Sequence, residues 1–350
     1  PGAGGAEQGF TSVHTRNFPA LLQRLNLSLA VSTYQAGKLI LVRADGDELN
    51  THFRQFASPM GVALDAQTRA LAVGTRHQIW TFRDHPAVAQ TLDPPGENDA
   101  VFLPRHTHFS GDIRVHEIGW VGRELWAVNT RFSCMCTFDP ESNFVPRWRP
   151  PFITAYAAED RCHLNGMAVK DGRVGLVTFL AQTDTPGGWR AHKADGGCLW
   201  DVGNDCLVAA GLCMPHSPRY HDGKVWLLES GVGALCLVDE AAGRTTEVVR
   251  LPGFTRGLAF VGPYAFVGLS QVRESAIFGG IPIAAEGQSR ACGVWVVDLR
   301  TGTVVAFLRF EGAVQEIFAV EVLPDIRFPE LINEPGESLD SSFVLPPTVR

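Results

Sequence analysis

A repeated strand plan constrains the fold more than any other feature of this sequence. Five segments share a polar start, a short apolar strand, a turn, a second apolar strand and a third strand that ends near an aspartate. Their starts are about 40–60 residues apart, the spacing of the blades of a β-propeller. The segments begin at Pro59, His116, His163, His216 and Phe254. The sequence therefore predicts an all-β propeller with four short strands in each blade.

The two ends of the chain supply one further blade. The segment QEIFAVEVLP, from Gln315, has the pattern of an innermost strand but lacks outer strands. The N-terminal segments LSLAVSTYQ, KLILVRAD and LNTHFRQFA have the pattern of outer strands without an inner one. Pairing them in one sheet gives a six-bladed propeller whose closure is shared by both ends, and it removes open sheet edges. Two tandem β-sandwiches are the alternative, but they leave the shared strand plan unexplained.

The repeat also sets the domain boundaries. We expect an N-terminal tail over residues 1–18, a single propeller domain over residues 19–330, and a C-terminal tail or strap over residues 331–350. Two insertions interrupt the repeat, at about residues 180–196 and 271–290. Long loops on a rigid scaffold often carry function.

Two local patterns refine this picture. The pairs Asp171-Gly172 and Asp222-Gly223 stand between apolar runs and predict tight β-hairpins. One segment, Pro19–Leu25, is a candidate helix.

Composition excludes several classes of protein. The 350 residues are 45% hydrophobic and 19% charged, which allows a core and argues against disorder. The net charge of −7 and the lack of a basic run argue against a nucleic-acid partner. No apolar stretch reaches the roughly 18–20 residues of a membrane helix, so we expect no membrane partner. Eight cysteines, mostly in apolar strands and without a signal peptide at Pro1–Gly9, favour free buried thiols and a cytoplasmic location.

Histidines recur at one place in the repeat. The first strand of every propeller blade lines the central channel, so equivalent positions form a ring. We aligned these strands on their small residues and counted back three places, which gives Ser58, His116, His163, His216, Phe254 and Gln315. Three neutral imidazoles with an open coordination position suit iron, copper, zinc or nickel. His116, His163 and His216 are therefore predicted to hold one transition-metal ion, and the alternative is that they line the channel and bond to one another and to water.

Polar residues near this ring are candidate catalytic groups. Glu117 and Glu316 directly follow ring positions and could orient ligands or move protons. Asn165 could bind substrate or satisfy the channel backbone. Arg219 and Arg256 could neutralise an anionic group through their planar guanidinium forks, or could form salt bridges with nearby glutamates.

Several motifs together resemble a known family. FSCMCTFD, EDRCHLNGMAV, TDTPGGWR, MPHSPRYHDGKVWLLESG, LPGFTRGLAF and FGGIPI are similar to a bacterial family of conserved hypothetical β-propeller proteins, found alone or beside tetratricopeptide repeats. The resemblance spans about Phe10–Glu330 and implies a propeller, but it implies no established activity. More distantly, the blade plan resembles gluconolactonase and strictosidine-synthase-like six-bladed propellers. Those gluconolactonases hold a divalent cation with carboxylate and amide ligands, and this sequence departs from them by offering histidines.

These features predict a metal-dependent enzyme. The histidine-only ligand set favours iron or copper, and hence an oxidoreductase that acts on a small molecule or a peptide side chain. Zinc would instead make the protein a hydrolase or lyase through a metal-activated water. A metal-independent enzyme with Glu117 or Glu316 as base is a further alternative. A propeller can also be a non-catalytic platform for a peptide or protein, in which the histidines are structural. The oligomeric state stays open.

Overall fold

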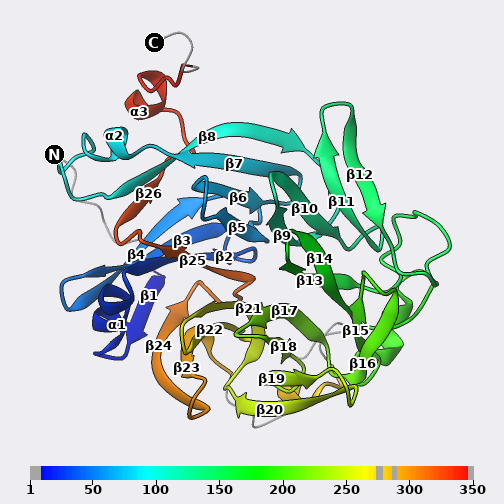
Figure 1. Ribbon diagram of the computed structural model, residues 1–350. Helices are drawn as coiled ribbons and strands as arrows, with labels where there is room; N and C mark the ends of the chain where they lie inside the picture. Colours follow the sequence, from blue (N-terminus) through cyan, green and yellow to red (C-terminus); the bar gives the residue numbers. More distant parts are fainter. Residues whose placement is uncertain (1–8, 273–278, 286–289, 346–350) are drawn as a thin grey trace.

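Six sheets stand around a central channel in the computed structural model of the chain (Figure 1). The structure describes residues 9–272, 279–285 and 290–345. Parts of the two expected tails (1–8 and 346–350) and of the second insertion (273–278 and 286–289) lie outside the described residues. The prediction of an all-β, six-bladed propeller is confirmed.

Blades 1 to 5 each contain four consecutive antiparallel strands, with the first strand innermost. Blade 1 contains β5 (Val62–Asp65), β6 (Ala70–Gly74), β7 (Gln78–Asp84) and β8 (Ala100–Phe109). Blade 2 contains β9 (Val115–Val121), β10 (Glu124–Asn129), β11 (Cys134–Asp139) and β12 (Ser142–Trp148). Blade 3 contains β13 (Leu164–Lys170), β14 (Arg173–Phe179), β15 (Gly197–Asp201) and β16 (Cys206–Leu212). Blade 4 contains β17 (Pro215–His221), β18 (Lys224–Glu229), β19 (Ala234–Asp239) and β20 (Arg244–Arg250). Blade 5 contains β21 (Phe254–Val261), β22 (Tyr264–Ser270), β23 (Cys292–Asp298) and β24 (Thr303–Gly312).

Blade 6 joins the two ends of the chain. Its innermost strand is β25 (Ala319–Pro324), and its outer strands are β2 (Leu27–Thr33), β3 (Lys38–Asp45) and β4 (Glu48–Gln55). Strands β2 and β25 pair antiparallel over six residue pairs, from Leu27↔Pro324 to Ser32↔Ala319. The prediction that N- and C-terminal strands share the closing blade is confirmed.

Two short strands lie at the predicted domain boundaries. β1 (Phe10–His14) pairs with β24 as a fifth strand of blade 5, so part of the range expected as an N-terminal tail belongs to a sheet. β26 (Pro329–Leu331) runs parallel to β8 along the outside of blade 1. The main chain therefore straps the ring at the boundary placed between residues 330 and 331.

The described helices are short and few. α1 (Phe18–Leu25) confirms the candidate helix; Pro19 stands in its first turn and Asn26 ends it in the left-handed conformation. Its buried residues Phe18, Leu21 and Leu22 pack into the core between blades 5 and 6. The remaining helical segments are α2 (Pro86–Ala89), α3 (Glu337–Asp340) and the 3₁₀ turns η1 (Gly188–His192) and η2 (Pro282–Ala284).

The predicted hairpin turns are present. Asp171 and Gly172 have φ values of 51° and 70° between β13 and β14, and Asp222 and Gly223 have 49° and 70° between β17 and β18. Positive φ at both central residues defines the type I′ turn, whose twist matches that of the flanking strands. The turn sequence thus fixes the register of each inner hairpin.

Apolar side chains fill the spaces between neighbouring blades. Between blades 2 and 3, Met135 packs with Leu164 and Phe179, all fully buried. Burial of each such side chain contributes about 1.5–3 kcal/mol. Gly257 allows β21 to approach β25 closely, since its φ is 81° and a Cβ atom there would lie 2.7 Å from the backbone nitrogen of Val320. The blades therefore converge on a narrow channel.

The structure bears on two further expectations. No helix among the residues that the structure describes is long and apolar enough to cross a membrane. All eight cysteines are free thiols, and only Cys206 is exposed.

Candidate functional site

One residue of each inner strand, or the residue just before it, lines a small cavity at one end of the channel. Hydroxyls from four blades locate these positions, because each donates to the carbonyl that precedes the ring residue of the next blade. These bonds are Ser32 to Met60 (2.5 Å), Thr130 to Leu164 (2.6 Å), Ser230 to Thr255 (2.5 Å) and Ser270 to Ile317 (3.0 Å). The ring residues, which all line the cavity, are Gly61, His116, Asn165, His216, Arg256 and Phe318.

This ring differs from the sequence alignment at four of its six positions. His116 and His216 keep their places, but Asn165 replaces His163 as the ring residue of blade 3. His116 and His216 each stand three places before the residue used for alignment, Gly119 or Arg219, and β9, β13 and β17 all have a register shift at the ring residue. Asn165 stands directly before Gly166, so counting back three places from the glycine overshoots the ring.

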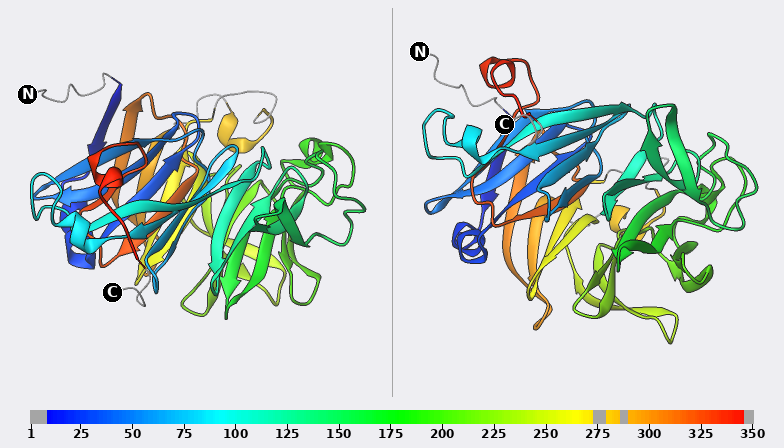
Figure 2. Two further views of the ribbon diagram at one scale, coloured as in Figure 1. Left: turned by 90° about the horizontal axis from the view of Figure 1, so that it is seen from above. Right: turned by 45° about the horizontal axis from the view of Figure 1, so that its top comes forward.

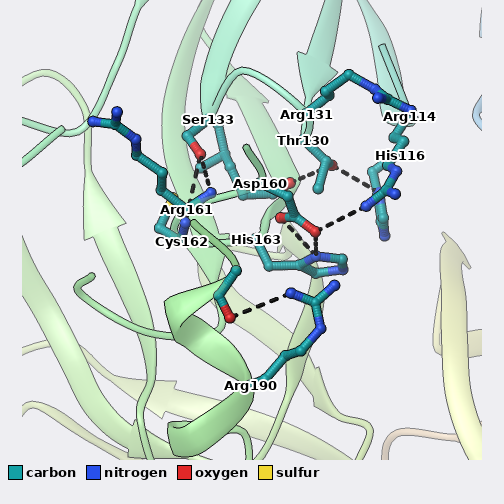
Figure 3. Close-up of polar contacts among 12 residues, drawn as sticks. Arg114, His116, Thr130, Arg131, Ser133, Asp160, Arg161, Cys162, His163 and Arg190 are labelled. Atoms are coloured by element: carbon teal, nitrogen blue, oxygen red, sulfur yellow. Dashed lines mark hydrogen bonds and ion pairs between the residues drawn. The ribbon is translucent and has the colours of Figure 1, made fainter. Parts of the chain in front are cut away.

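His163 nevertheless comes to the same place from the loop that precedes β13. Its backbone has a φ of 53°, and its ring centroid lies 4.9 Å from that of His116. The His116 and His216 centroids are 6.1 Å apart. The three predicted histidines therefore cluster, as Figure 3 shows for His116 and His163.

Each of the three imidazoles is held through Nδ1. His163 lies 3.0 Å from both carboxylate oxygens of Asp160 (Figure 3). Nδ1 of His116 lies 2.8 Å from the Thr130 hydroxyl, which donates its own proton to the Leu164 carbonyl. Nδ1 of His216 lies 2.9 Å from the Met214 carbonyl.

These partners set the tautomers. A carboxylate, a carbonyl and a hydroxyl whose proton is already committed all act as acceptors, so Nδ1 must be the donor in each ring. In the neutral form of each ring, Nε2 then carries the lone pair. Among the described residues, none forms a hydrogen bond with Nε2 of His116, His163 or His216.

Two of these imidazoles are held neutral. Burial lowers the pKa of His116 and of His216 well below the ordinary value, and the positive charge of Arg256 lowers both further. Neutral imidazole is the form that binds metals. As arranged here, however, no group of three or more His, Cys, Asp or Glu side chains in the described part of the chain is placed to hold a metal ion.

Arg256 is the cation of the ring. Its guanidinium lies over the Phe318 ring, 3.6 Å from the centroid, and burial lowers its pKa to about 10. None of the ion pairs formed by the described residues includes Arg256. Glu316 is partly buried nearby, accepts a hydrogen bond from the Tyr34 phenol, and does not line the cavity.

The other three candidate residues, Glu117, Arg219 and Asn165, each form hydrogen bonds with a neighbouring inner strand. Glu117 forms an ion pair with Arg219 and accepts a hydrogen bond from the Met167 amide at 2.9 Å. Arg219 also donates to the Leu258 carbonyl at 3.0 Å, so this pair spans the inner strands of blades 2 to 5. Asn165 donates to the Pro215 carbonyl and accepts from the Thr178 hydroxyl, which occupies its amide. These contacts fit the structural alternative for all three.

The two insertions meet above the histidines. Figure 2 shows η1 and η2 on the same face of the ring. Leu180 and Trp189 from the first insertion share one apolar cluster with Ile281 and Ile283 from the second. The Trp189 ring lies 4.3 Å from that of His163, and its indole nitrogen is buried without a hydrogen-bond partner. The first insertion thus packs against one of the three histidines, and the described part of the second packs against the first.

Comparison with known proteins identifies a family that this chain matches. A model of a domain of unknown function, DUF4915, matches residues 16–332. The chain belongs to the DUF4915 family. No curated protein matches it.

Solved structures extend the comparison of the DUF4915 fold. A chain in a crystal structure of a nidogen/laminin complex is 10% identical, with a TM-score of 0.53 over 85% of this chain and 99% of that chain. A protein of unknown function from Bacteroides caccae is 10% identical, with a TM-score of 0.51 over 85% and 98%. These likenesses concern the fold alone. The distant similarity to gluconolactonases and strictosidine-synthase-like propellers, and the association with tetratricopeptide repeats, stay predictions.

Sequence reasoning missed the residues that position the DUF4915 histidines. Thr130 and Ser230 both stand 14 residues after their histidine, so their common offset in two repeats was available as a signal. Asp160 stands three residues before His163 and also pairs with Arg114 (Figure 3). No repeat marks that carboxylate, because it lies in a connection between blades.

A second cavity, of about 490 Å³, lies at the opposite end of the inner strands. Glu321 on β25 and Phe260 on β21 line it. Glu321 accepts a hydrogen bond from the Leu64 amide at 2.9 Å, and burial raises its pKa to about 7. Nothing in the repeat pattern singled out this carboxyl group.

Proposed function

We propose that this protein is a metal-dependent enzyme whose transition-metal ion binds at His116, His163 and His216. The observation that carries the proposal is the shared arrangement of the three imidazoles, in which Nδ1 donates to a fixed acceptor and Nε2 keeps its lone pair. Histidines that bind metals usually have their second ring nitrogen held in this way.

The donor set fits a transition metal in its chemistry, but the rings do not converge on one point in the described structure. Metal binding therefore requires the imidazoles to turn toward a common point. Bound iron or copper would supply redox chemistry, for which we propose a small molecule or a peptide side chain as substrate.

The chain's own residues would prepare this site. Asp160 holds the orientation of His163, and burial keeps His116 and His216 neutral at neutral pH. Trp189 packs against His163 and would shield that ring from water, which strengthens electrostatic interactions there. Eight free thiols support a reducing, cytoplasmic location as part of the same proposal.

Metal analysis of the full chain, purified without added metal, tests the proposal. We expect about one transition-metal ion per chain in the native protein. His116→Ala, His163→Ala and His216→Ala should each lose it. His221→Ala is the matched control, because His221 lies at the far end of β17 and bonds to the Gly262 carbonyl.

Cobalt(II) titration of the metal-free protein gives a second readout through its visible absorption. A native protein without stoichiometric metal that also fails to bind cobalt would refute the proposal. Retention of full metal content in His163→Ala would refute the three-histidine assignment.

A further inference from the structure

The channel ring combines one positively charged side chain, Arg256, with the lone pairs of two imidazole nitrogens. Nε2 of His116 and of His216 can only accept, since Nδ1 holds the proton in both rings. One N–H of the Asn165 amide donates to the Pro215 carbonyl and its oxygen accepts from Thr178, which leaves this side chain at most one neutral donor. Arg256 is therefore the one ring residue, among those the structure describes, that can offer a ligand a charged fork of several donors.

No carboxylate among the described residues forms an ion pair with Arg256. The Phe318 ring covers one of its faces, Glu117 is paired with Arg219, and Glu316 accepts a hydrogen bond from the Tyr34 phenol, so the charges of both glutamates act on Arg256 only from a distance. A buried charge without a directly paired partner is unfavourable. A ligand that supplies the negative charge would explain why the buried Arg256 lines this cavity.

The size of the cavity limits that ligand. Its volume is about 20 Å³, whereas one buried water needs about 10–15 Å³. Only a small end group of a ligand fits this volume. A planar carboxylate matches the guanidinium fork with two parallel hydrogen bonds.

We propose that Arg256 binds the carboxylate of an anionic small-molecule substrate, so that the enzyme acts on carboxylic acids. This inference rests on the proposed function, because it names the substrate class of the same site. A carboxylate between Arg256 and a metal ion held by His116 and His216 would also separate two positive charges that otherwise repel each other.

Calorimetric titration of the full chain with sodium formate tests the assignment. Formamide is the control ligand, because it has the same shape and no charge. We expect formate but not formamide to bind the wild-type protein. Arg256→Gln should weaken formate binding by about tenfold or more, and Arg256→Lys should weaken it less, because a lysine keeps the charge but loses the fork. Arg123→Gln, in the exposed turn after β9, should bind formate as wild type does.

Each outcome separates this inference from the metal proposal. Formate binding that is equal in wild type and Arg256→Gln, with metal content unchanged, overturns the role of Arg256 and leaves the metal site standing. Formate binding that depends on Arg256 in a protein without metal supports the anion site and overturns the metal site. Thermal unfolding with and without formate gives a second measure of binding and shows whether each variant is folded. Formate should raise the midpoint of the wild type and leave that of a folded Arg256→Gln unchanged, and an equal rise in both would count against the proposal.

Discussion

The carboxyl group of Glu321 should make the stability of the protein fall as the pH rises. Burial raises its pKa from the ordinary 4.5 to about 7, so the folded chain binds this proton more tightly than the unfolded chain. The stabilisation is complete below pH 4.5 and is lost as the pH rises through 7. The interval from 4.5 to about 7, at about 1.4 kcal/mol per pH unit, corresponds to roughly 3 kcal/mol.

Glu321→Gln isolates this effect, because the amide oxygen can still accept the Leu64 amide proton. We expect wild type and variant to have similar free energies of unfolding at pH 4.5. At pH 8.5 the variant should be more stable by roughly 3 kcal/mol. Urea titrations followed by tryptophan fluorescence, at several pH values between 4.5 and 8.5, measure the difference.

Glu330→Gln is the matched control of opposite sign. Although burial disfavours its charge, hydrogen bonds from His52 and the charge of Arg54 lower the pKa of Glu330 to about 2. This carboxylate stabilises the fold above pH 4.5 and loses that effect as the pH falls toward 2. The control should therefore be less stable than wild type at neutral pH. A difference between wild type and Glu321→Gln that stays constant with pH, or grows on acidification, would refute the reasoning.

Three further predictions concern the channel and its cover. Asp160→Asn should weaken metal binding by about 10–100-fold in a cobalt titration, because it removes the charged partner of His163, and unchanged affinity would contradict that role. Gly257→Ala should lower the free energy of unfolding in urea by more than the roughly 1 kcal/mol typical of strained φ, because its Cβ atom would also meet Val320, and a variant as stable as wild type would contradict the close approach. Trp189→Phe should leave the stability in urea within about 1 kcal/mol of wild type, because the indole N–H lacks a partner, whereas Trp189→Ala should cost about 3–5 kcal/mol, and equal costs would count against this reasoning.

Local patterns carried enough information to predict the ring of blades. Type I′ turn pairs such as Asp171-Gly172 fix hairpin register within a few residues, and alternating apolar residues mark the two faces of each blade. Even the closing blade was predictable, because β25 lacked outer strands after it and β2 lacked an inner strand before it. β1 was not, since FTSVH resembles a polar tail and becomes a strand only through the free edge of β24.

The site was predictable in its residue types but not in its geometry. His116 and His216 stand at equivalent positions, yet the reference residue of β13, Gly166, directly follows the ring residue Asn165 instead of standing three places beyond it, which shifted the alignment to His163. A shift of this kind leaves no mark in the apolar pattern. Whether Arg219 meets a substrate or Glu117 also depends on side chains from four different blades, which spacing along the chain does not encode.

The pairing of β2 with β25 has a consequence for biosynthesis. A ribosome makes β2, β3 and β4 near the start of the chain and reaches Ala319 only after the other five blades have emerged. Until then the inner edge of β2 presents unpaired N–H and C=O groups, which can recruit strands from other nascent chains. The entropy of bringing the distant segments together grows only logarithmically with their separation, so the delay adds little to the free energy of folding. The risk of mispairing therefore exists only in the nascent protein, before β25 has been made, and not in the folded ring.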